Sequence, residues 1–169
     1  MRSKIKKSII NILYFIYRIV RKPILWYQKK FNIKTRGVRV LVVFEDKIIL
    51  VKHWYNNLYV VPGGGIKKTE TPEQAAVREV FEETGIKIKQ LDYLLGIYSN
   101  AKGGKNDTVY CYVVLLKKEP EIKKRFNLEI AHCVLCDISK LPHQTSPATK
   151  QRINEYKNND ISEDIRLWV

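Results

Sequence analysis

The chain has 169 residues, which is enough for one domain with a substantial core and leaves little room for a second. Hydrophobic residues make up 45% of it and charged residues 28%, a balance that excludes a disordered or fibrous protein. The formal net charge of +14 is concentrated at one end, because 12 of the 31 Lys and Arg residues and none of the 17 Asp and Glu residues precede Glu45. The rest of the chain is nearly neutral, so no nucleic-acid partner is expected, since such a partner requires a basic stripe on the folded domain.

Residues 1–34 form a basic amphipathic segment, and residues 35–169 are expected to form the folded domain. The uncharged run from Ser8 to Tyr17 is too short to cross a bilayer, and basic residues follow it where a signal peptide would have small ones. Helical spacing places basic side chains on one stripe and apolar side chains on the remaining face, up to Pro23. This pattern predicts an amphipathic helix on an anionic membrane surface through residues 4–30. The alternative is a helix packed on its own domain or on a second copy of the chain, and the oligomeric state stays open.

A hairpin opens the domain. Two apolar runs, Val38–Phe44 and Ile48–His53, flank a polar turn and predict two paired strands. A brief strand is expected at Tyr59–Val61, before the break at Pro62 and the glycines Gly63–Gly65.

A helix is predicted from Thr71 to Thr84 by several independent signals. Thr71 is a candidate N-cap, Pro72 suits the first helical position, and Gln74 completes a capping box. Gly85 supplies the C-terminal stop.

The second half of the chain is predicted to consist of strands and one closing helix. Strands are expected at Ile86–Tyr98 and Thr108–Leu116, joined by the loop at 102–106, and at Ala131–Asp137, before an amphipathic helix at Pro147–Lys157. Strands around a central helix, with a second helix at the end, indicate an α+β protein with α/β/α layering.

The three cysteines indicate no disulfide framework. Cys133 and Cys136 form a C-x-x-C on a predicted strand, where residues three apart face opposite sides. We therefore expect three reduced thiols, including Cys111, in a cytoplasmic protein that is peripheral at the inner face of the membrane if its N-terminal helix binds lipid.

The predicted helix at Thr71–Thr84 carries a cluster of carboxylates. Glu79, Glu82 and Glu83 stand at i, i+3 and i+4 and share one side of the helix, and Arg78 pairs most naturally with Glu82. Uncompensated carboxylates suit Mg²⁺, and the preceding glycines let backbone approach a metal ion or a phosphate closely.

The spacing of these residues is that of a known signature. It runs from Gly64 through five residues to Glu70, and through seven more to Arg78-Glu79-Val80-Phe81-Glu82-Glu83-Thr84-Gly85-Ile86. The chain thereby resembles the Nudix hydrolases at every defining position of their box, and the resemblance extends over about Lys34 to Lys157. It implies the Nudix fold, an α/β/α sandwich with a mixed β-sheet, to which the N-terminal amphipathic helix is an addition.

The resemblance also implies roles for single residues. The divalent-metal ligands would be Glu79, Glu82, Glu83 and the carbonyl of Gly64. Arg78 would orient the glutamates, and Glu70 would support the loop or the metal site. The cation would be Mg²⁺, with Mn²⁺ an open alternative.

The general base stays open between Glu83 and Glu129, which lies before the strand at Ala131–Asp137. His132 and His53 are weaker candidates. For substrate binding we consider Lys52, Tyr55, Gly63, Gly65 and Tyr98, with Trp54, Tyr59, Lys67, Lys68 and Lys102 as further possibilities for stacking or phosphate contacts.

The leading hypothesis is hydrolysis of a pyrophosphate bond in a nucleoside diphosphate linked to another moiety. The alternatives are a house-cleaning nucleoside triphosphate pyrophosphatase, a Nudix-fold module that binds a nucleotide without cutting it, and a membrane-tethered enzyme acting on a lipid-linked or coenzyme-like diphosphate.

Overall fold

The computed structural model describes residues 34–100, 106–122 and 129–168. The predictions made for residues 4–30 and for Lys102 lie outside this range. Within it, no helix is long and apolar enough to cross a membrane.

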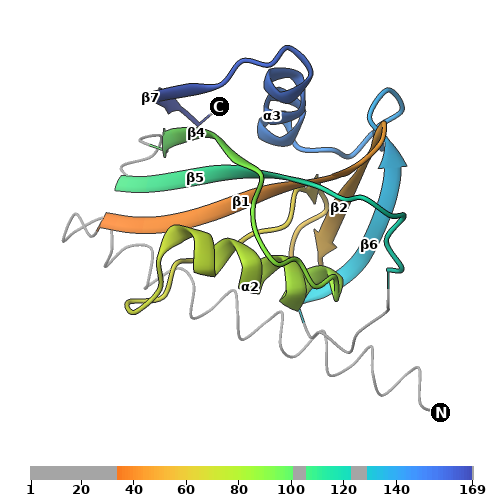
Figure 1. The fold of residues 1–169 in the computed structure, drawn as a ribbon, viewed down its shortest axis with the longest axis horizontal. Helices are drawn as coiled ribbons and strands as arrows, with labels where there is room; N and C mark the ends of the chain where they lie inside the picture. The colour runs from red at the N-terminus through yellow and green to blue at the C-terminus, as the bar shows by residue number, and fades with distance from the viewer. Residues whose placement is uncertain (1–33, 101–105, 123–128, 169) are drawn as a thin grey trace.

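One mixed sheet forms the centre of the molecule (Figure 1). β1 (Lys34–Phe44) runs parallel to β5 (Asn106–Leu115) over its whole length, and β5 pairs antiparallel with β4 (Tyr93–Asn100). The alternating apolar residues of β1 face both sides of the sheet, so this strand is buried on both faces.

The other half of the sheet is organised by β2 (Lys47–His53). It pairs with β6 (Ile130–Asp137) along its whole length, with β1 only next to the turn that joins them, and with β3 (Tyr59–Val60) near its other end. Where β2 has left β1, the carbonyls of Pro62 and Gly64 accept hydrogen bonds from the N–H groups of Val40 and Val38 on β1.

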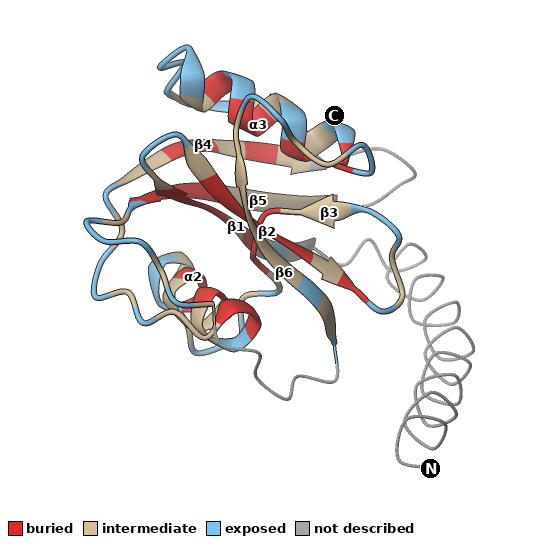
Figure 2. Ribbon diagram, turned by 90° about the vertical axis from the view of Figure 1, so that its right-hand side faces the viewer, coloured by how far each residue is buried: buried red, intermediate tan, exposed pale blue. Residues whose placement is uncertain are grey.

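Two helices cover the sheet, one on each face (Figures 1 and 2). α2 (Pro72–Thr84) buries Ala75, Ala76 and Val80 against one face, and α3 (Pro147–Lys157) buries Ile153 against the other. The predicted α/β/α sandwich with a mixed sheet is therefore confirmed.

The local signals that define α2 are confirmed in detail. Thr71 accepts a hydrogen bond from the backbone N–H of Gln74, whose side chain accepts from the N–H of Thr71, and Pro72 begins the helix. Gly85 ends it in the left-handed region, at φ 78°. These contacts fix the start and the rotation of the helix that carries the glutamates.

One strand prediction had the wrong start, and one strand was not predicted. The expected strand from Ile86 begins only at Tyr93, because Ile86, Ile88 and Leu91 pack instead against the core beneath α2. An unpredicted strand, β7 (Ser162–Leu167), adds to the sheet edge parallel to β4.

The cysteine prediction agrees with the packing. Cys133 packs against the core on the α2 side and Cys136 against the core on the α3 side, and all three thiols are free. Burial raises the pKa of Cys111 and of Cys133 to about 12, so both are poor nucleophiles.

Candidate metal and phosphate site

The glycine loop lies along the start of β1. The backbone N–H of Val38 donates to the carbonyl of Gly64 at 2.9 Å, and the N–H of Ile66 donates to the carbonyl of Arg36 at 3.0 Å. These bonds attach the loop to the rigid sheet, so its carbonyls and N–H groups have fixed positions.

Each of the first two glycines is required by a close contact. Gly63 has φ 148°, and a Cβ there would overlap the carbonyl oxygen of Val38. At Gly64 a Cβ would lie 2.5 Å from Oε1 of Glu79, whereas at Gly65 it would meet nothing within 4 Å. The carboxylate of Glu79 therefore occupies the space that a side chain at Gly64 would fill.

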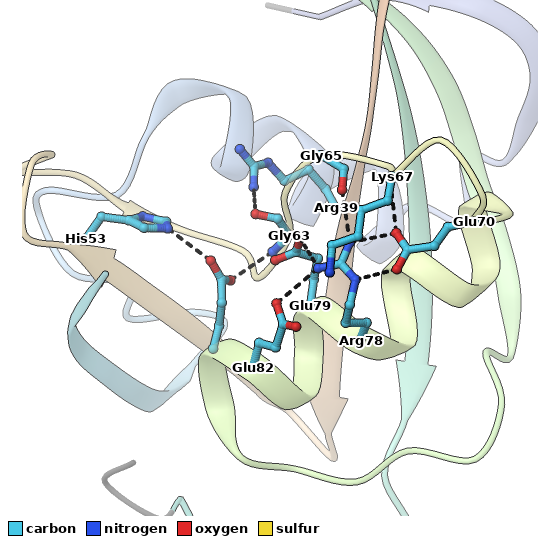
Figure 3. A network of polar contacts seen from close by, with 10 residues as sticks. Arg39, His53, Gly63, Gly65, Lys67, Glu70, Arg78, Glu79 and Glu82 are labelled. Atoms are coloured by element: carbon cyan, nitrogen blue, oxygen red, sulfur yellow. Dashed lines mark hydrogen bonds and ion pairs between the residues drawn. The ribbon is translucent and has the colours of Figure 1, made fainter. Parts of the chain in front are cut away.

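Arg78 lies at the centre of the cluster (Figure 3). Its Nε and Nη2 donate to the two oxygens of Glu70 at 2.6 and 2.9 Å, and its Nη1 donates to Glu79 at 2.6 Å and to Glu82 at 3.0 Å. Nη2 also donates to the carbonyl of Gly65 at 3.0 Å. The ion pair between Arg78 and Glu82 was predicted. Arg78 also binds the carboxylates of Glu70 and Glu79, because its guanidinium has five donors in a planar fork.

This arrangement sets the ionisation of two of the glutamates in opposite directions. The Arg78 hydrogen bonds and the backbone N–H of Lys67 lower the pKa of Glu70 to about 2. Burial raises the pKa of Glu79 in spite of Arg78, and the carboxylates of Glu83 and Glu82 raise it further. Arg78 faces three carboxylates, which together carry more negative charge than one guanidinium compensates.

Glu83 has different partners from the other glutamates. Its side chain is only 4% exposed, and its Oε1 lies 3.0 Å from Nε2 of His53 at the end of β2. Its Oε2 accepts from the backbone N–H of Gly63 at 2.9 Å. The structure thus brings His53, a weak candidate in the sequence, into direct contact with a predicted metal ligand.

The donor set has the chemistry that a hard divalent cation requires. Among residues 34–100, 106–122 and 129–168, no three His, Cys, Asp or Glu side chains converge on one point, because Glu79 and Glu82 turn to Arg78 while Glu83 turns to His53. Each carboxylate oxygen can accept at two positions, however, and the two oxygens of Glu83 use one apiece in the hydrogen bonds to His53 and Gly63. Excess negative charge and oxygen donors fit Mg²⁺ or Mn²⁺.

Arg39 is a residue of this site that the sequence analysis missed. Its guanidinium donates to the carbonyl of Gly63. The feature of the sequence that could have indicated its role is a charged residue in the middle of the apolar strand β1.

Three predicted substrate or base residues are placed on or near β2 and β6. Nζ of Lys52 bonds to Oε1 of Gln144 at 3.0 Å and lies over the ring of Tyr59. The half-buried Tyr55 packs its ring against His53, at 5.0 Å between centroids. Glu129 is exposed, and its carbonyl accepts from the N–H of Trp54, which follows His53.

Tyr98 is not placed to stack on a substrate. It is fully buried on the α3 side of the sheet, and its hydroxyl bonds to Glu155 at 2.6 Å and to Arg166 at 2.7 Å. The prediction failed because the residue lies inside the core beneath α3 and not at a strand end.

Comparison with known proteins places this site in a family. The NUDIX domain model matches residues 33–156. A human diphosphoinositol polyphosphate phosphohydrolase is 46% identical over 71 residues, a match that covers 41% of this chain and 38% of the relative. The chain thus aligns with well under half the length of the curated relatives it matches.

Solved structures show the same fold. A MutT NUDIX hydrolase from Burkholderia pseudomallei superposes with a TM-score of 0.60 at 22% identity, covering 72% of this chain and 97% of that one. An ADP-ribose pyrophosphatase from Streptococcus suis does so with a TM-score of 0.61 at 20% identity, covering 79% of this chain and 98% of that one.

Proposed function

The chain belongs to the Nudix hydrolase family, and from this membership we propose that it hydrolyses a pyrophosphate bond in a nucleoside diphosphate linked to another moiety, with Mg²⁺ or Mn²⁺ as cofactor. The observation that supports the proposal most is the position of the Glu79 carboxylate, which fills the space that a Cβ at Gly64 would need. It joins the glutamate helix to the loop whose backbone would face a diphosphate.

The cation would be held by Glu79, Glu82 and Glu83, with the carbonyl of Gly64. When bound, it would neutralise the diphosphate, lower the pKa of a water molecule and stabilise the leaving oxygen. Arg78 keeps two of these carboxylates on the loop side of α2 through its hydrogen bonds to Glu79 and Glu82.

Proton transfer from the attacking water requires a base, and the two carboxylate candidates are Glu83 and Glu129. Glu83 is buried beside the glycine loop, and Glu129 lies on the chain next to the end of β2. A positioned base of this kind contributes about 10²–10⁴-fold to the rate. Both residues stay candidates for the role.

A second substrate class is favoured by the relatives. They are named for hydrolysis of diphosphoinositol polyphosphates, and the identity in the matched stretch is 44–46%. A densely anionic substrate would also suit Lys52, which stands beside the ring of Tyr59. We therefore include this class in the test on equal terms with the nucleotides.

The test is hydrolysis by the purified protein of a substrate panel, with Mg²⁺ and then Mn²⁺. The panel holds ADP-ribose, dinucleoside polyphosphates, nucleotide sugars, coenzyme A, NADH, nucleoside triphosphates and a diphosphoinositol polyphosphate, and Glu83→Gln is the control. Turnover of one class, lost in the control, would support the proposal and name the substrate, and release of pyrophosphate from triphosphates would favour the house-cleaning alternative. Binding without turnover would point to a nucleotide-binding module.

A further inference from the structure

We propose that His53 is a positioning residue that holds the carboxylate of Glu83 in the orientation needed to bind the divalent cation. The inference rests on the proposed function, in which Glu83 is a metal ligand. His53 lies on β2, outside the stretch from Gly64 to Ile86 that holds the other residues proposed for the metal site.

The contact is short, buried and specific. Nε2 of His53 lies 3.0 Å from Oε1 of Glu83, and the two side chains are 8% and 4% exposed. A carboxylate that binds a cation can only accept a hydrogen bond, so the proposed role requires Nε2 to donate in this contact. Burial makes the bond costly to lose, since water cannot replace the missing partner.

The two bonds on Glu83 fix the plane of its carboxylate. His53 binds Oε1 from the β2 side, and the N–H of Gly63 binds Oε2 from the loop side at 2.9 Å (Figure 3). A carboxylate held at both oxygens cannot rotate about its last bond. One acceptor position on each oxygen stays available, so Glu83 can bind a cation without breaking either hydrogen bond.

Contacts with β6 and with Tyr55 hold His53 in place. It is the last residue of β2, where it pairs with Ile130 of β6, and its ring packs against that of Tyr55 at 5.0 Å. With a residue exposure of 7%, the ring has no room to act on a substrate directly. Its role is therefore to position Glu83 and not to transfer a proton to the substrate.

The first experiment measures Mn²⁺ binding to the metal-free protein by electron paramagnetic resonance. His53→Phe keeps a ring and removes the donor, and we expect it to weaken Mn²⁺ binding by about 10–100-fold. His53→Gln can place an amide N–H near the position of Nε2 and should retain most of the affinity, whereas the shorter His53→Asn cannot reach and should behave like His53→Phe. His143→Gln, at an exposed histidine in the turn before α3, is the matched control and should bind as the wild type does.

The outcomes separate this inference from the proposed function. No Mn²⁺ binding by the wild type would overturn both. Wild-type binding that His53→Phe leaves unchanged, or that His53→Gln loses as fully as His53→Asn, would overturn the positioning role alone. If His53 had only a structural role, His53→Phe would lower the unfolding temperature of the metal-free protein and leave the Mn²⁺ affinity of the folded protein unchanged.

A second measurement needs no variant. In the ¹⁵N-labelled wild type, the NMR chemical shifts of the two ring nitrogens of His53 report which nitrogen carries the proton. The contact with Glu83 requires a proton on Nε2, and a bare Nε2 would overturn the inference even if every His53 variant failed to fold.

Discussion

Replacing each of the three adjacent glycines of the loop by alanine should give three different results. At Gly64 the new Cβ would lie 2.5 Å from Oε1 and 2.6 Å from Cδ of Glu79. Carbon atoms pack comfortably at about 3.5–4.0 Å, so the carboxylate must retreat by about 1 Å. It can do so by turning its own side chain, because the three atoms nearest to the new methyl group all belong to the far end of Glu79.

The expected cost of Gly64→Ala is therefore small in stability and large in rate. Forcing the Glu79 side chain off its preferred rotamer should lower the free energy of unfolding of the protein by about 0.5–1.5 kcal/mol. A misplacement of about 1 Å in a reacting site costs about 10²-fold in rate. Thermal unfolding and hydrolysis of the substrate identified in the panel measure the two effects separately.

The neighbouring glycines are the matched controls. Gly63→Ala should destabilise the fold by about 1–3 kcal/mol from its positive φ alone, and by more because the carbonyl of Val38 cannot move away. Gly65→Ala meets nothing within 4 Å, and its stability should stay within about 0.5 kcal/mol of the wild type. If Gly64→Ala hydrolyses its substrate no more slowly than Gly65→Ala, the reasoning about Glu79 is refuted.

Three further predictions concern other parts of the chain. The folded-state pKa of Glu70, about 2, is below its ordinary 4.5, so Glu70 stabilises the protein above pH 4.5 and this stabilisation is lost as the pH falls through about 2. Thermal unfolding should find metal-free Glu70→Gln less stable than the wild type above pH 4.5, with a gap that closes toward pH 2; a constant gap would contradict this. If Glu129 is the base, Glu129→Gln should lower kcat by about 10²–10⁴-fold with Mn²⁺ affinity unchanged, and an unchanged kcat would leave Glu83 as the candidate. The full chain should sediment with anionic vesicles while a chain starting at Lys34 stays in the supernatant, and equal behaviour of the two would rule out the membrane-binding helix.

The sequence predicted those elements whose signals are local. The capping residues of α2 act within four positions of one another, so Thr71, Gln74 and Gly85 could be interpreted without knowledge of the fold. β7 has no such signal, because its residues are largely exposed and only pairing with the edge strand β4 makes it a strand. The apolar residues of the segment from Ile86 to Leu91 suggested a strand, but they pack against the core beneath α2 and the segment is not a strand.

The site was predictable to the extent that it lies on one helix. Spacing placed Glu79, Glu82 and Glu83 on one side of α2, but it carried no information about what faces each of them from the sheet. Arg39 and His53 come from separate strands, and only the divergence of β2 from β1 brings both to the glycine loop.

The surroundings of the three glutamates differ more than their spacing suggests, and this difference bears on the metal-binding role proposed for them. Successive residues on a helix are turned by about 100°, so Glu82 points toward solvent, with 48% of its side chain exposed, while Glu83 points into the sheet. Glu79 lies between them, against the loop. If the three glutamates hold a cation as proposed, the exposed Glu82 can adjust to it more readily than Glu83, whose two oxygens are fixed by His53 and Gly63. The position of the cation would then be set mainly from the buried side of the helix. Substitutions that loosen Glu83 should therefore weaken metal binding more than equivalent substitutions around Glu82.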